Sequence, residues 1–68
     1  DGGVEGLDFY RIIAHEARLH LKDGGKLFLE IGYDQRSDVT DILKTNNYTG
    51  ITCVKDYSGN DRVISCGV

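Results

Sequence analysis

Hydrophobic side chains recur every three or four residues between Leu7 and Lys22, and this spacing predicts an amphipathic helix. The predicted buried stripe consists of Tyr10, Ile13, Ala14, Ala17 and Leu21. We expect Phe9 and Ile12 to widen this stripe. The Asp23-Gly24-Gly25 sequence that follows predicts the end of the helix, because glycine readily adopts the left-handed conformation of a C-terminal cap.

The pattern then changes to alternation in GGKLFLEIGYDQ, residues 24–35. Lys26 to Ile31 is predicted to be a strand, in which Leu27 and Leu29 face one side and Phe28 and Glu30 face the other. Apolar side chains on both faces are typical of a strand that is covered on both sides, as in a mostly parallel α/β sheet.

A second, shorter apolar stripe predicts a helix from Gln35 to Asn46. Asp34 is a candidate N-terminal cap, since its side chain can accept a hydrogen bond from a free backbone N–H. Asn46-Asn47 is expected to end this helix, because asparagine tolerates the left-handed conformation.

Two more strands are predicted, at Gly50–Asp56 and Arg62–Cys66, on either side of the turn sequence YSGND. With Gly59-Asn60 at its centre, the turn is expected to be a type II′ hairpin. That register would place Cys53 directly opposite Cys66. We nevertheless expect both thiols to be free packing residues, since a cytosolic protein rarely keeps a disulfide.

The predicted order is therefore helix, strand, helix, strand, strand, which indicates an α/β protein. A strand–helix–strand unit is expected to cross over right-handed and to leave its two strands parallel, whereas the last strand is antiparallel to its hairpin partner. The 68 residues are expected to form one partial domain, with residues 1–6 as a loop.

Composition narrows the function classes without selecting one. The chain is 40% hydrophobic and 28% charged, with a net charge of −3, which is not the basic footprint of an autonomous nucleic-acid binder. No segment is long and apolar enough for a membrane span. His15 and His20 are five residues apart, so on a helix they point in different directions. With only two cysteines elsewhere in the chain, a four-ligand zinc site is not expected. We expect a cytoplasmic protein that binds no metal and no membrane.

Three blocks carry a resemblance to a known family: GGVEGLDFYRIIAHEA, LKDGGKLFLEIGYDQ and VKDYSGNDRVI. In this order and spacing they resemble the C-terminal part of the HemK/PrmC family of protein-glutamine methyltransferases. The resemblance implies a class I, Rossmann-like sheet in which the last strand is antiparallel and lies between its two predecessors. It also implies transfer of a methyl group from S-adenosylmethionine to the glutamine side-chain amide of a peptide-chain release factor.

Two parts of that family's machinery have no counterpart in this sequence. The family holds the target amide with an Asn-Pro-Pro-Tyr motif, but this chain has no proline. The glycine-rich cofactor loop is also missing, because Gly2, Gly3 and Gly6 neither follow a strand nor have the required spacing. We therefore expect an inactive C-terminal fragment that has no catalytic residue, no cofactor-binding residue and no bound S-adenosylmethionine.

Three residues are candidates for the substrate side of the intact enzyme: Glu30, Gly32 and Gln35. In an open α/β sheet, ligands bind beyond the carboxyl ends of the strands, where Glu30 and Gly32 are expected to lie. The alternative for Glu30 is a solvated carboxylate or a loop cap, and for Gln35 an ordinary polar residue at the start of a helix.

Two other functions fit the sequence. One is a fragment of a related methyltransferase that acts on nucleic-acid amino groups, and the other is a small non-enzymatic α+β module that binds a protein. If the chain is a fragment, its sheet has lost neighbouring strands and presents an unpaired edge, so self-association through that edge or low stability is expected.

Overall fold

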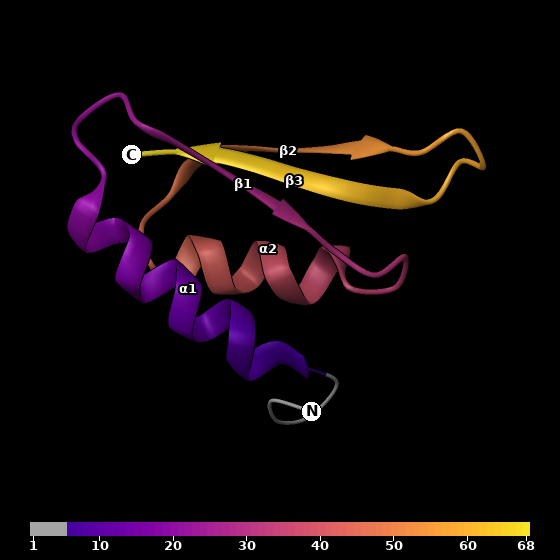
Figure 1. Cartoon of the computed structure of the whole chain (residues 1–68), viewed down its shortest axis with the longest axis horizontal. Helices are drawn as coiled ribbons and strands as arrows, with labels where there is room; N and C mark the ends of the chain where they lie inside the picture. Colours follow the sequence, from indigo (N-terminus) through magenta and orange to yellow (C-terminus); the bar gives the residue numbers. More distant parts are fainter. Residues whose placement is uncertain (1–5) are drawn as a thin grey trace.

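The computed structural model describes residues 6–68, so most of the predicted 1–6 loop lies outside the described residues. The elements follow one another in the predicted order (Figure 1): α1 (Leu7–His20), β1 (Lys26–Glu30), α2 (Arg36–Thr45), β2 (Thr49–Lys55) and β3 (Asp61–Gly67). Neither helix is long and apolar enough to cross a bilayer.

The three strands form one sheet in the order β1-β3-β2, and β3 is antiparallel to both neighbours. Strands β1 and β2 therefore run parallel to each other without touching, because β3 lies between them. This is the position that the family resemblance implies for the last strand. The structure is thus α/β, with two helices and a three-stranded antiparallel sheet.

Both helices lie on the same side of the sheet, and the core fills the space between them (Figure 1). The sheet contributes Leu29, Ile64 and Cys66, which alternation places on the helix side. The helices and the loops beside the strands contribute the other buried side chains: Leu7, Tyr10, Ala14, Ile31, Val39, Ile42, Leu43 and Tyr48. One layer of helices on one face of a sheet therefore accounts for the whole described core.

The opposite face of the sheet is open, which corrects the prediction that β1 is covered on both sides. Phe28 is 64% exposed and Val54 is 60% exposed. On this face, Phe28 of β1 lies opposite Ser65 of β3, and Glu30 of β1 lies opposite Val63 of β3. No described element packs against this face, because α1 and α2 both lie on the other side.

Helix α1 ends at His20, two residues earlier than predicted, and Lys22 lies beyond it. Leu21 is already extended, and the glycines instead form the tight turn into β1. Gly24 has a φ of +84°, and a Cβ on Gly25 would lie 2.8 Å from the Lys22 carbonyl oxygen. Glycine is therefore required by the turn rather than by the helix end.

The predicted buried stripe of α1 is narrower than expected. Tyr10 and Ala14 are buried, while Ile13, Ala17 and Leu21 are half-buried. Phe9 and Ile12 are 57% and 63% exposed, so they do not widen the stripe. Sequence periodicity alone extends the stripe toward them, but no described element lies over that flank of the helix.

Helix α2 begins at Arg36, after Gln35 in the N-cap position. The prediction that Asp34 caps this helix is therefore wrong. The N-cap residue makes no side-chain hydrogen bond to the helix start. The helix ends as expected, because Asn47 adopts a left-handed φ of 66°. The next residue, Tyr48, is buried and donates a 2.7 Å hydrogen bond to the Ala14 carbonyl of α1, which ties the two helices together.

The hairpin register differs from the prediction, since Cys53 pairs with Ile64 rather than with Cys66. The loop is wider than a two-residue turn: the Asp56 N–H donates to the Asn60 carbonyl, and the Asp56 carboxylate accepts from the N–H groups of Ser58 and Asn60. Both cysteines are free thiols, as predicted. Burial raises the pKa of the Cys66 thiol.

The core position at the centre of β3 gives the first prediction. Ile64→Val removes one methylene from a side chain that is 0% exposed, and we expect it to lower the free energy of unfolding by about 0.5–1.5 kcal/mol. The matched control is Ile12→Val, at 63% exposure, with an expected change within about 0.5 kcal/mol. Urea unfolding followed by circular dichroism measures both, and equal losses would contradict this core.

Candidate functional site

The candidate site lies where β1 ends and the chain turns toward α2. Pairing with β3 continues one residue past Glu30, because the Ile31 N–H donates to the Arg62 carbonyl at 2.8 Å. The chain then turns, and the Gln35 N–H donates to the Gly32 carbonyl at 3.0 Å. This hydrogen bond closes the loop between the strand and α2.

The Gln35 side chain closes the same loop from the other direction. Its Oε1 accepts a 2.8 Å hydrogen bond from the Gly32 N–H. Gly32 leaves room for this contact, since a Cβ at that position would lie 3.2 Å from Gln35 Oε1 and 3.4 Å from Gln35 Cδ. A side chain at Gly32 would therefore push the amide away from the backbone that it holds.

A tyrosine from α1 completes the site. The Tyr10 hydroxyl lies 2.8 Å from the Glu30 carbonyl oxygen and 3.2 Å from Gln35 Oε1, so its single proton is shared between two acceptors. Burial, and then the negative charge of Glu30, raise the pKa of Tyr10. The hydroxyl therefore keeps its proton at neutral pH and acts as a donor.

The structure brings Glu30, Gly32 and Gln35 together, although not in the roles expected from the sequence. Glu30 contributes its backbone carbonyl, while its side chain belongs to the exposed face of the sheet. Gly32 and Gln35 bond to each other and hold the loop. The predicted substrate-side roles of these three residues stay predictions.

Tyr10 is the residue that sequence reasoning missed. The pattern placed it correctly in the buried stripe of α1, but only as a packing residue. A buried tyrosine hydroxyl generally needs a hydrogen-bond partner, and this was the available signal. The pattern could not name the partner, because Glu30 lies 20 residues further along the chain.

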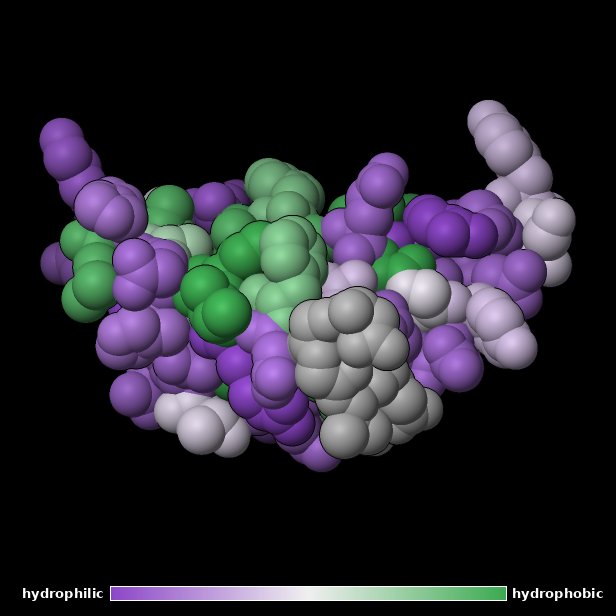
Figure 2. Space-filling view, turned by 60° about the horizontal axis from the view of Figure 1, so that its bottom comes forward, coloured by the Kyte–Doolittle hydropathy of each residue, from purple (hydrophilic) through white to green (hydrophobic). Residues whose placement is uncertain are grey.

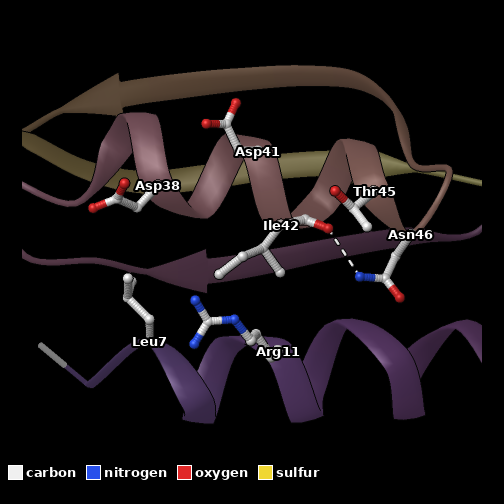
Figure 3. A pocket seen from close by; sticks show the side chains of 7 residues that line it. All are labelled: Leu7, Arg11, Asp38, Asp41, Ile42, Thr45 and Asn46. Carbon is white, nitrogen blue, oxygen red and sulfur yellow. Dashed lines mark hydrogen bonds between the residues drawn. The ribbon is translucent and has the colours of Figure 1, made fainter. Parts of the chain in front are cut away.

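A separate groove of about 470 Å³, lined by both polar and apolar side chains, runs between α1 and α2 (Figure 3). Leu7 and Arg11 reach into it from α1, opposite Asp38 and Asp41 of α2. Arg11 is paired at 2.8 Å with Asp8 of its own helix. The groove is lined by the helices and not by the loop after β1, so it is not part of the candidate site.

The tyrosine contact gives the second prediction. Tyr10→Phe removes the hydroxyl and leaves the ring, and we expect it to lower the free energy of unfolding by about 0.5–1.5 kcal/mol. The matched control, Tyr57→Phe, changes a fully exposed ring and should cost less than about 0.5 kcal/mol.

The same variant has a pH signature. Because the folded-state pKa of Tyr10 is raised above its ordinary value of 10.0, the wild type keeps this contribution below pH 10 and loses it as the pH rises through the raised pKa. The stability difference between wild type and Tyr10→Phe should therefore be constant up to pH 10 and shrink above it. A difference that grows at alkaline pH would contradict the assigned donor role.

Comparison with known proteins gives no match to a protein-family model. The sequence does match curated relatives. It is 53% identical over 60 residues to a release factor glutamine methyltransferase of Fusobacterium nucleatum, which covers 88% of this chain and 17% of that protein. It is 46% identical over 65 residues to a release factor glutamine methyltransferase of Agrobacterium fabrum, which covers 96% and 22%.

A third relative, described as a bifunctional methyltransferase of Rickettsia felis, is 47% identical over 60 residues, or 88% of this chain and 11% of that protein. The chain spans about a fifth of the length of the first two relatives. Identity at this level over nearly all of the chain establishes common descent. The chain belongs, as a segment, to the release factor glutamine methyltransferase family.

Proposed function

We propose that this chain is the C-terminal segment of a cytoplasmic, S-adenosylmethionine-dependent methyltransferase that acts on the glutamine side-chain amide of a peptide-chain release factor. The observation that supports this most directly is the 41–53% identity to five relatives of that name, over 88–96% of the chain. In the whole enzyme a methyl group passes from the cofactor sulfonium to the amide nitrogen, which gives up a proton.

The fold gives independent support. In the resemblance described above, the sheet of the family ends with an antiparallel strand between its two predecessors, and β3 lies between β1 and β2 in this way. We therefore assign residues 1–68 to one partial domain that supplies one end of a larger class I sheet. In the larger protein, further strands would extend the sheet at the outer edge of β1, and other elements would cover its open face.

The described residues do not fit S-adenosylmethionine by themselves. At the end of β1, the Glu30 carbonyl accepts from Tyr10, and the Gly32 N–H and carbonyl are both bonded to Gln35. The groove between the helices presents Asp38 and Asp41, without an aromatic side chain for the adenine. We therefore assign cofactor binding to other parts of the enzyme.

The role that we assign to this segment is to shape the substrate side of the pocket. Tyr10 and Gln35 fix the loop after β1 from two sides, at 2.8 Å to Glu30 and 2.8 Å to Gly32. This leaves the Glu30 side chain exposed at the carboxyl end of β1, the end of the sheet beyond which the whole enzyme would place its substrate. Glu30 is thus the substrate-side candidate, and Gly32 and Gln35 position its loop.

The comparisons do not favour the two other functions considered from the sequence. Two of the relatives reported above are named release factor glutamine methyltransferase, and the third is named only as a bifunctional methyltransferase. Neither description names a nucleic-acid amino group. A non-enzymatic binding module would not require identity to methyltransferases across nearly the whole chain.

The proposal predicts no cofactor binding by the isolated chain. Titration of S-adenosylmethionine at millimolar concentration should give no heat in calorimetry, because the polar groups at the end of β1 are already paired within the chain. Saturable binding would contradict the assignment of the cofactor site to other parts of the enzyme.

A chimera tests the proposed activity. Residues of this chain replace the matching 60-residue segment of the Fusobacterium nucleatum relative, and methyl transfer to release factor is measured by mass spectrometry. We expect kcat/KM within about tenfold of the unmodified relative, equivalent to about 1.4 kcal/mol of transition-state stabilisation.

The control is the same chimera with Leu43→Asp, which places a charge at a site with 0% exposure and should abolish activity together with folding. A chimera that melts like the unmodified relative, binds S-adenosylmethionine and yet transfers no methyl group to release factor would refute the proposed function.

A further inference from the structure

The hairpin loop between β2 and β3, residues 56–60, is held by hydrogen bonds within itself. The Asp56 carboxylate accepts from the N–H groups of Ser58 and Asn60 at 2.9 Å and 3.0 Å. The Asp56 N–H donates to the Asn60 carbonyl at 2.8 Å, and the carboxylate also pairs with Arg62 at 3.1 Å. The backbone of the hairpin loop therefore has a defined conformation before any partner binds, which lowers the entropic cost of binding.

The side chains of the same loop project into solvent with unused hydrogen-bonding groups. Tyr57 is the most exposed of the large apolar and aromatic side chains in the described part of the chain. Within that part, the Tyr57 hydroxyl, the Ser58 hydroxyl and the Asn60 side-chain amide have no hydrogen-bond partner. Antibody loops that bind proteins are rich in tyrosine, serine, glycine and asparagine, because a tyrosine offers a large contact area for the loss of only two torsions. The sequence YSGN at residues 57–60 has this composition.

The hairpin loop lies at the end of the sheet where the proposed substrate side is found. Strands β1 and β2 are parallel, so the loop after β1 and the hairpin loop both follow the carboxyl end of a strand (Figure 1). The Ile31 N–H donates to the Arg62 carbonyl at 2.8 Å, and Arg36 lies 3.6 Å from Asp61, so the two loops are joined. Ligands of open α/β sheets bind beyond this end. In the larger sheet proposed above, further strands join β1 on the far side from β2 and do not cover the hairpin loop.

The charges around the hairpin loop favour a protein partner over a nucleic acid. Lys55 pairs with Asp61 at 2.8 Å and Arg62 pairs with Asp56 at 3.1 Å, so the base of the loop carries no net charge. The groove of about 530 Å³ beside this base is lined by charged side chains of both signs: Arg36, Lys44, Asp34, Asp41 and Asp61. Nucleic-acid phosphates instead require an excess of lysine and arginine.

The distribution of hydrophobic side chains agrees with this. In Figure 2 the hairpin end of the molecule, at the right, is purple to white, whereas the exposed hydrophobic side chains gather nearer the other end. Tyr57 is therefore a single aromatic side chain within polar surroundings. An aromatic anchor with a polar rim is the usual anatomy of an interface between two proteins.

We propose that Tyr57 anchors a docking surface for the substrate protein, outside the pocket that receives the target glutamine. This inference rests on the proposed function, which makes the substrate a release factor, a protein rather than a small molecule. The Tyr57 ring packs against the surface of the release factor, and Ser58 and Asn60 supply hydrogen bonds around it. Asp56 is a positioning residue that holds the loop in shape. The hairpin loop thus contributes to the affinity for the substrate and not to the methyl transfer itself.

Steady-state kinetics of the chimera described above test the anchor. Tyr57→Ala should raise KM for release factor by about tenfold and leave kcat within about twofold, because a docking contact is equally strong in the ground state and the transition state. Tyr57→Phe keeps the contact area of the ring and should raise KM less than Tyr57→Ala does. A merely structural role would not separate KM from kcat in this way.

The matched control is Lys22→Ala, which also truncates an exposed side chain but precedes β1, at the opposite end of the sheet, and should leave KM unchanged. Circular dichroism and S-adenosylmethionine binding check that every variant is folded. An active chimera in which Tyr57→Ala leaves KM unchanged refutes the docking surface and leaves the proposed function standing. A folded chimera that binds S-adenosylmethionine and methylates no release factor refutes the proposed function, and the docking surface for that partner with it.

Photo-crosslinking locates the contact without relying on turnover. With p-benzoylphenylalanine in place of Tyr57, irradiation of the chimera mixed with release factor should join the two proteins, and mass spectrometry should place the link at this position. The same group in place of Lys22 should give no such product. Equal cross-linking from both positions, or none from position 57, would overturn the proposal.

Discussion

Strand β3 holds the sheet together, because it is the hydrogen-bonding partner of both other strands. β1 and β2 run in the same direction and do not touch, so every ladder bond in the described sheet involves β3. The centre of this strand is Ile64, which is paired with Leu29 on one side and Cys53 on the other and has no solvent exposure. The two halves of the described chain, one with α1 and β1 and the other with α2 and β2, therefore share a single hydrophobic and hydrogen-bonding centre.

Two tyrosine hydroxyls fix the position of α1 by hydrogen bonds, which hydrophobic packing alone does not do. Tyr48 donates to the Ala14 carbonyl at 2.7 Å, and Tyr10 donates toward the Glu30 carbonyl at 2.8 Å. Burial is the main cause of the raised pKa of both phenols, so both stay protonated donors at neutral pH. A buried donor has a defined partner and a defined distance, whereas hydrophobic contact fixes neither. These bonds fix α1 against the start of β2 and against the end of β1.

The same arrangement gives the backbone and the side chain of Glu30 separate roles. Glu30 has its carbonyl turned to the outer edge, where Tyr10 binds it, and its carboxylate on the open face. We propose this carboxylate as the substrate-side candidate.

The sequence by itself determined the element order, the approximate bounds of both helices and all three strands, and the left-handed Asn47 that ends α2. It could do so because periodicity and the conformational preferences of glycine and asparagine act over a few residues. The three-block resemblance also led to the family that the comparisons establish. Tertiary structure alone decided the hairpin register, in which the Asp56 carboxylate widens the loop and separates Cys53 from Cys66. It also decided which apolar side chains stay exposed, such as Phe9 and Phe28, and which groups meet Tyr10. The exposed side chains and the partners of Tyr10 depend on contacts between residues far apart in the chain, which no local pattern contains. The loop bonds of Asp56 join residues at most four apart, but several turn geometries suit the same residues, so the sequence did not select this register.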